Sequence, residues 1–275
     1  MTLVHPGTIL QQQNFVVAAN AILLEQAEAL IAAGEKAETG IVLQLSENTI
    51  NYHGSIEPIA LALLALARQS KTPVAVHLDH ATSPKLVLKA IEMGFPSVMF
   101  DGSQLPFDEN LSTTIDLAQK SRNQGVWFEA ELGEVGGKDG VHAPGVRTDP
   151  SQAADFVEQT KVDALAVAVG SSHAMSEKKA HLDLKLIVEL ASAVPVPLVL
   201  HGSSGVELPE LRKAISAGIR KINVATEFNI VFNNAVAAYF RGHASLSDPR
   251  KYLRPAKEAM EAAMVDYLRE LNKSG

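Results

Sequence analysis

Three histidines each end or follow a short apolar run rich in β-branched residues. His80 ends VAVHLDH, His173 ends ALAVAVGSSH and His201 ends PLVLH. Three protein ligands with one open position are typical of a catalytic divalent metal site. One such histidine is more often a hydrogen-bonding residue, but three at separate strand ends together favour a shared metal ion. The chain has no cysteine, so His, Asp or Glu must hold any metal.

Carboxylates accompany these histidines at the predicted strand ends. Asp79 precedes His80, Asp101 follows the fourth run, and Glu129 and Glu131 end the fifth. From the residues alone, Asp79 is equally well interpreted as a general base beside the metal or as a cap for the helix after Thr82. His77 lies deeper in the third run, and we interpret it as structural.

Two turn segments are candidates for binding phosphate. Gly202-Ser203-Ser204-Gly205 follows the seventh run, and Asn223-Val224-Ala225-Thr226 leads from the eighth into a predicted helix. Backbone amides at turns and helix N-termini bind phosphate, and late loops are the usual phosphate site of barrel enzymes. Either segment alone could be an ordinary loop, but their consecutive positions favour a phosphate site.

Alternating strands and helices must position these residues. The helix-like segments include Leu24–Lys36, Pro58–Gln69, Pro84–Met93, Asn110–Asn123, Gln152–Gln159, Leu184–Ala191, Pro209–Ala217, Glu227–Phe240 and Pro255–Leu271. The strands are predicted at Phe15–Ala19, Ile41–Leu45, Val74–Leu78, Ser97–Phe100, Val126–Glu131, Ala164–Val169, Pro197–Leu200 and Ile222–Val224. Continuously apolar strands suit a parallel sheet buried on both faces. We therefore predict one α/β domain over residues 1–275, a (β/α)₈ TIM barrel with additional C-terminal helices; an open doubly wound sheet is the alternative.

Composition narrows the function classes. The 275 residues carry a net charge of −7, which argues against nucleic-acid binding through bulk charge. No stretch of about 20 apolar residues predicts a membrane span, and no signal peptide is evident, so we expect a cytoplasmic protein. Lys71, Lys161 and Lys221 fall at the predicted N-terminal starts of strands, the wrong end of a barrel for a Schiff-base lysine.

The segments HLDHA, EAELGEVGG, GSSH, VLHGSSG, KINVATE and DPRKYLRPAKEAM together resemble the class II, metal-dependent fructose-bisphosphate and tagatose-bisphosphate aldolases. The likeness runs from about Phe15 to Met260. It implies reversible cleavage of a phosphorylated ketose to dihydroxyacetone phosphate and an aldehyde such as glyceraldehyde 3-phosphate. It also suggests a homodimer or homotetramer.

The resemblance implies a role for individual residues. His80, His173 and His201 match the ligands of one Zn²⁺, and Asp79 matches the proton-transferring aspartate. Gly202, Ser203, Ser204 and Asn223 to Thr226 match the segments that hold dihydroxyacetone phosphate. Glu131 and Asp101 are candidates for a secondary metal position, and a Na⁺ or K⁺ ion is expected near Gly170 and Gly202.

Other positions bear on the substrate envelope. Ala174 and Lys178 follow the second zinc histidine, where the family usually has Gly, Tyr and Lys, and Asp139 is a candidate second base in a loop one residue shorter than usual. Asn20, Ser46 and Arg254 are candidates for the far end of the substrate, although Arg254 could equally cap a helix.

Two other functions fit the same barrel. One is a metal-dependent hydrolase in which Asp79 activates a metal-bound water; the first run lacks the His-x-His pair that many such enzymes carry there. The other is an inactive aldolase-like accessory subunit, against which the intact His80, His173, His201 and Asp79 argue.

Overall fold

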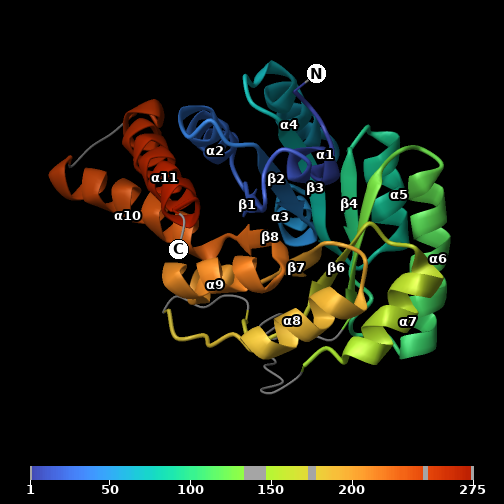
Figure 1. Cartoon of the computed structure of the whole chain (residues 1–275). Helices are drawn as coiled ribbons and strands as arrows, with labels where there is room; N and C mark the ends of the chain where they lie inside the picture. The colour runs from blue at the N-terminus through green and yellow to red at the C-terminus, as the bar shows by residue number, and fades with distance from the viewer. Residues whose placement is uncertain (1, 133–146, 173–177, 244–246, 274–275) are drawn as a thin grey trace.

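Eight parallel strands close into a barrel in the order in which they occur along the chain (Figure 1). The structure, a computed structural model, describes residues 2–132, 147–172, 178–243 and 247–273. The strands are β1 (Val16–Asn20), β2 (Ile41–Ser46), β3 (Val74–Ala81), β4 (Ser97–Phe100), β5 (Trp127–Leu132), β6 (Ala164–Val167), β7 (Leu198–Leu200) and β8 (Ile219–Val224). Because β1 also pairs with β8, the predicted barrel is confirmed and the open sheet is excluded.

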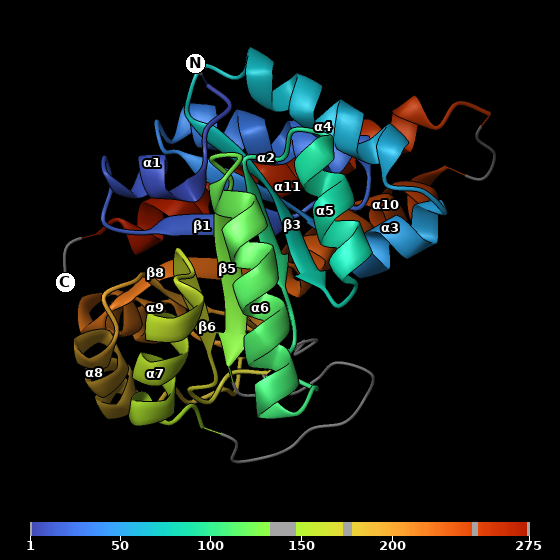
Figure 2. The same ribbon diagram turned by 90° about the vertical axis from the view of Figure 1, so that its right-hand side faces the viewer.

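The predicted helices are present, and they surround the barrel. They are α2 (Leu24–Lys36), α4 (Glu57–Gln69), α5 (Pro84–Glu92), α6 (Phe107–Arg122), α7 (Pro150–Thr160), α8 (Leu184–Ala193), α9 (Leu208–Ala217), α10 (Thr226–Gly242) and α11 (Arg250–Leu271). Figure 2 shows α5 and α6 lying over β3 and β5; α5 contacts β3 and β4, and α6 contacts β5.

Three helix assignments differ from the sequence-based prediction. Helix α11 begins at Arg250, and Pro255 lies inside it; proline favours a first turn, but the residues before it continue the helix. The short helices α1 (Pro6–Leu10) and α3 (Glu47–His53) were not predicted. Residue Ile9 of α1 packs against inward-facing residues of β1, β2 and β3.

Side chains alternate between two cores along the strands. Val17 and Ala19 of β1 belong to the large core between sheet and helices, whereas Val16 and Ala18 belong to a separate cluster inside the barrel. A second interior cluster contains Met99, Trp127, Ala164, Ala166 and Val199. These apolar clusters fill much of the barrel interior, and they help to hold the polar side chains nearer the strand ends in place.

The C-terminal helices α10 and α11 pack against each other, and α11 also packs against α2 (Figure 1). Within the described ranges, no single helix is long and apolar enough to cross a membrane. The pair α3 and α4 passes that test by length and composition only when its members are taken together, and it is bent by 120°.

A one-residue irregularity ends β3. Leu78 pairs with Val98 and Ala81 with Phe100, so β3 has one more residue than β4 between these two pairs. His80 has a φ of +50°, a left-handed conformation uncommon for a residue with a side chain. Such a bulge redirects the side chains beside it.

Candidate active site

A cavity of about 530 Å³ opens at the C-terminal ends of the strands. Its lining includes most of the predicted site residues of the described ranges and several others. The lining residues are Asn20, Ser46, Glu47, Asn48, Asn51, Asp79, His80, Thr82, Asp101, Gln104, Leu105, Ser172, His201, Gly202, Ser204, Asn223, Val224, Ala225 and Thr226. The cavity is therefore placed where barrel enzymes carry their active sites.

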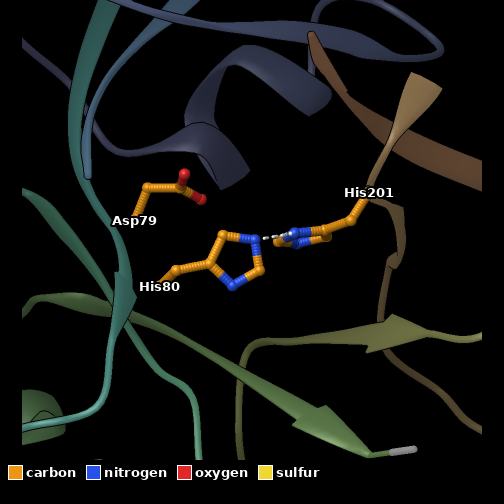
Figure 3. Close-up of side chains that lie close together, drawn as sticks. All are labelled: Asp79, His80 and His201. Carbon is orange, nitrogen blue, oxygen red and sulfur yellow. Dashed lines mark hydrogen bonds between the residues drawn. The ribbon is translucent and has the colours of Figure 1, made fainter. Parts of the chain in front are cut away.

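His80 and His201 point their rings at each other across this cavity (Figure 3). Nε2 of His80 lies 2.6 Å from Nδ1 of His201. A carboxylate oxygen of Asp79 lies within 4.8 Å of a ring nitrogen of each histidine. The third predicted ligand, His173, lies outside the described residues. Two of the three predicted histidines thus converge from opposite sides of the barrel.

Each ring has a carboxylate at its other nitrogen. Nδ1 of His80 lies 2.8 Å from Oδ2 of Asp101, and Nε2 of His201 lies 3.0 Å from Oε1 of Glu129. A neutral imidazole that donates from one nitrogen has a lone pair on the other. When each ring donates to its carboxylate, the two nitrogens that face each other both offer lone pairs to a metal ion. A carboxylate behind each ring is the usual surrounding of a metal-bound histidine. This donor set fits a divalent metal ion.

Burial favours the neutral state of His201. It lowers the pKa of this ring below its ordinary value, although the hydrogen bond with Glu129 opposes the shift. A metal ligand has to be a neutral imidazole, so the environment of His201 is suited to ligation.

Asp79 is held by three side-chain amides. Its Oδ1 accepts hydrogen bonds from Gln44 at 3.0 Å and Asn223 at 3.4 Å, and its Oδ2 accepts one from Asn20 at 3.2 Å. Consecutive strand residues normally point to opposite faces, but the bulge after Leu78 lets Asp79 and His80 both line the cavity. The helix-cap interpretation of Asp79 is wrong, because no side-chain cap hydrogen bond is present at α5.

Asp101 and Glu131 lie together beside His80. Ligand atoms of the three residues lie within 4.8 Å of one another, and Glu131 is fully buried, with its Oε2 3.7 Å from Nδ1 of His80. Asp101 lines the cavity, while Glu131 does not. The two residues predicted for a secondary metal position are thus adjacent, on the side of His80 away from His201.

The two predicted phosphate turns meet at one side of the cavity. Gly202, Ser204 and Val224 to Thr226 line it, whereas Ser203 is buried and donates from its hydroxyl to the carbonyl of Leu200. The hydroxyl of Ser204 accepts from the backbone amides of Ala225 and Glu227, both at 3.3 Å. Ser204 therefore joins the 3₁₀ turn Ser203–Gly205 to the start of α10.

Gly202 is the position in these turns that a side chain would disrupt. Its φ is +68°, and an added Cβ would lie 2.4 Å from the carbonyl oxygen of Ser172. We expect Gly202→Ala to lower the free energy of unfolding by more than the matched Gly54→Ala, because Gly54 has a φ of +75° with nothing within 4 Å of such a Cβ. The Gly54 variant should lose about 1–2 kcal/mol through the left-handed backbone alone. Urea unfolding measures both, and equal losses would contradict the expected clash.

Besides Ser203, two predicted substrate residues within the described ranges do not line the cavity. Nζ of Lys178 is 2.8 Å from Oε1 of Glu227, and Arg254 is exposed on α11. Asn20 and Ser46 do line it. Ala174 and Asp139 lie outside the described residues. The prediction for Lys221 was wrong in position: it is the third residue of β8, inside the barrel and fully buried, rather than at a strand's start.

The sequence analysis missed the contribution of α3. Its residues Glu47, Asn48 and Asn51 line the cavity together with Thr82, whose backbone and hydroxyl donate to Glu47. A local signal was present, because Ser46 is an N-cap that accepts from the amide of Thr49, and Gly54 ends the helix in a left-handed conformation.

A buried ion pair lies beneath His201. Nζ of Lys221 is 2.9 Å from Oε2 of Glu129, and His77 has its Nε2 3.7 Å from the same oxygen. Burial alone would raise the pKa of Glu129, but Lys221 and the hydrogen bond with His201 outweigh burial and hold it well below its ordinary value. His77 is buried with Nδ1 2.6 Å from the hydroxyl of Ser97, in the structural role we predicted.

Known proteins resemble this chain over nearly its whole length. A sequence model of the family described as "Fructose-bisphosphate aldolase class-II" matches residues 8–275. A Bacillus subtilis (strain 168) protein named "Probable fructose-bisphosphate aldolase" is 39% identical over 255 residues, covering 91% of this chain and 90% of the relative. The "Fructose-bisphosphate aldolase" of Geobacillus stearothermophilus is 36% identical over 256 residues, covering 92% and 89%.

A solved structure, that of the YdjI aldolase from Escherichia coli K12, superposes with a TM-score of 0.85 at 28% identity, covering 99% of this chain and 98% of that one. These matches favour carbon–carbon bond cleavage over the hydrolase that the same barrel could have supported. With the family described above matched from residue 8 to the last residue, the chain belongs to the class II fructose-bisphosphate aldolases, a family of metal-dependent lyases.

Proposed function

We propose that this aldolase reversibly cleaves a phosphorylated ketose of the fructose- or tagatose-1,6-bisphosphate type. The products are dihydroxyacetone phosphate and an aldehyde such as glyceraldehyde 3-phosphate. The observation that carries the proposal is the meeting of the His80 and His201 rings beside Asp79, with a carboxylate behind each ring. This is a metal site and a proton-transfer group in one cavity.

The metal in this proposal is one Zn²⁺ per subunit. Nε2 of His80 and Nδ1 of His201 would hold it, with His173 as the third ligand by family resemblance. A bound zinc ion supplies a Lewis acid that polarises the ketone oxygen of the substrate. Asp101 and Glu131 are the proposed secondary position, because they are hard oxygen donors adjacent to His80.

Asp79 is the proposed general base for cleavage. It takes the proton from the C4 hydroxyl, the C3–C4 bond breaks, and the electron pair of that bond stays on the ketone half as the C4 oxygen becomes the aldehyde. In condensation, Asp79 returns the proton to that oxygen. The amides of Gln44, Asn20 and Asn223 hold the carboxylate in one orientation for this transfer. A second base for the proton at C3 is required, and Asp139 is our candidate.

The phosphate of the ketone half is proposed to bind at the two predicted phosphate turns, which meet at one side of the cavity. Gly202, Ser204, Ala225 and Thr226 line the cavity there, and α10 begins at Thr226. The N-terminus of a helix attracts an anion through its backbone amides and its dipole. A Na⁺ or K⁺ ion near the carbonyls of Gly170 and Gly202 completes the proposal, as the family resemblance implies.

The far end of the substrate is proposed to contact Asn20 and Ser46. Arg254 is exposed on its own subunit, so it would serve this end only from a neighbouring subunit of a homodimer or homotetramer. Sedimentation velocity measures the assembly directly, and a monomer would remove Arg254 from the proposal.

Metal removal should abolish the activity. We expect dialysis against a chelator to leave less than about a thousandth of the cleavage rate, since a metal ion contributes several kcal/mol of charge stabilisation. Adding one equivalent of Zn²⁺ should restore the rate. The measurement is triose formation from each bisphosphate with the purified chain alone, beside its metal content. Full activity in a metal-free sample would contradict the mechanism, release of inorganic phosphate would indicate a hydrolase, and no turnover would indicate an accessory subunit.

A further inference from the structure

A row of polar contacts connects the barrel interior to the proposed metal ligand. Nζ of Lys221 is 2.9 Å from Oε2 of Glu129, and Oε1 of Glu129 is 3.0 Å from Nε2 of His201. Nδ1 of His201 in turn faces Nε2 of His80. The side chains of Lys221, Glu129 and His201 are all 0% exposed.

The charge on Glu129 decides which nitrogen of His201 carries the proton. An ionised carboxylate only accepts hydrogen bonds, so the ring nitrogen that faces it has to be an N–H. A neutral ring has one N–H, and its proton is then on Nε2, which leaves the lone pair of Nδ1 directed at His80. Lys221 holds the other oxygen of this carboxylate, with its Nζ 2.9 Å from Oε2, so Oε1 is the atom that faces His201.

Besides Glu129 and Lys221, Asp79 is a charged neighbour of His201, with a carboxylate oxygen within 4.8 Å of a ring nitrogen; His77 and Asn223 are neutral and weaker partners. His77 has its Nε2 3.7 Å from Glu129, beyond hydrogen-bond distance, and its Nδ1 is engaged with Ser97. The amide nitrogen of Asn223 lies 3.2 Å from Nε2 of His201 and 3.5 Å from Nδ1, so it does not distinguish the two nitrogens by much. The Glu129 carboxylate, 3.0 Å from Nε2, is the group that distinguishes the two ring nitrogens.

We propose that Glu129 and Lys221 are positioning residues that make His201 a metal ligand through Nδ1. His80 has the opposite arrangement, with Asp101 at Nδ1 and Nε2 facing the site. The two histidines therefore present different ring nitrogens to the same point. The proposal rests on the proposed metal site, and it assigns Lys221 a role in metal binding although its ammonium is separated from the ring by Glu129.

The Glu129→Gln variant tests the role of the carboxylate. Next to Lys221, the glutamine amide should turn its oxygen to the ammonium and its NH₂ to His201. Nε2 then has to accept, and the proton moves to Nδ1. We expect Zn²⁺ affinity, measured in metal-free protein by competition with a chromogenic chelator, to fall about 10- to 100-fold, as for other residues that support metal ligands.

A double variant separates positioning from structure. Glu129→Met with Lys221→Met removes both buried charges, which often leaves stability unchanged or raises it, but leaves no carboxylate behind His201. We expect a thermal midpoint near that of the wild type with Zn²⁺ affinity still reduced about 10-fold or more. Lys257→Met, which removes an ion pair with Glu28 between α11 and α2, is the control for the substitution itself and should bind Zn²⁺ normally.

The tautomer of His201 gives a readout that needs no activity. In metal-free wild type labelled with ¹⁵N-histidine, the ring signal absent from His201→Gln should show its proton on Nε2. A proton on Nδ1 there overturns the inference, and so does wild-type Zn²⁺ affinity in either folded variant. If the wild type binds no Zn²⁺ at all, the proposed metal site is wrong. The tautomer of His201 still tests whether Glu129 and Lys221 position the proton on Nε2.

Discussion

Replacing Asp79 with asparagine should lower kcat for cleavage by about 10²- to 10⁴-fold, the usual contribution of a positioned general base. Asparagine has the same shape and still lines the cavity, but it cannot take the proton of the C4 hydroxyl. Asp79 accepts from three amides, so the new NH₂ group also faces hydrogen-bond donors. We expect the loss to fall mainly on kcat, with KM changed much less.

Metal content and folding have to be followed in the same variant. Asp79→Asn should retain its Zn²⁺, because His80 and His201 are unchanged. Asp116→Asn on the exposed face of α6, where the side chain pairs with Lys120, is a matched control that should keep full activity. An Asp79→Asn enzyme with metal bound and a kcat within a few-fold of the wild type would show that another group transfers the proton.

Replacing either His80 or His201 with alanine should remove both the metal and the activity. The loss in kcat/KM should exceed about 10³-fold, because the several kcal/mol that the metal supplies are lost together. Metal analysis of the dialysed proteins beside the cleavage rate measures this directly. Excess Zn²⁺ should restore little of the rate, since the rings that would hold the ion converge from β3 and β7 and each one is required.

The control for these variants is a histidine elsewhere on the chain. His243 follows α10 and is exposed, with Nδ1 2.9 Å from the carbonyl of Tyr239. His243→Ala should bind metal and turn over like the wild type. Stoichiometric zinc in His201→Ala, with activity near that of the wild type, would mean that the ion is held elsewhere and would remove His201 from the site.

The barrel could be predicted from the sequence because short runs rich in apolar residues recur along it and helix-like segments follow them at regular intervals. The same reasoning located the cavity, since polar residues such as Asp79, His80 and His201 gather near the C-terminal ends of the strands. A parallel barrel brings the C-terminal ends of its strands together at one face. Residues that end different apolar runs of the sequence therefore become neighbours in space.

Hydrophobic periodicity could not supply the rest. Helix α3 is seven residues long, too short for a hydrophobic period to identify it. Lys221 was assigned to a strand's start because the predicted eighth strand begins at Ile222, and its partner Glu129 lies 92 residues away in the sequence. Arg254 is exposed and does not line the cavity of its own chain, so its proposed role requires a neighbouring subunit.

The extra residue in β3 has a consequence for protein engineering. An ordinary strand cannot direct an acid and the metal-binding imidazole that follows it into one cavity, since neighbours alternate between the inner and outer faces. Here the irregular pairing between Leu78 and Ala81, with the left-handed backbone at His80, makes this possible. Grafting Asp79 and His80 onto an unrelated barrel would therefore require inserting a residue as well as changing two, and shortening β3 by one would turn one of the pair toward the surrounding helices.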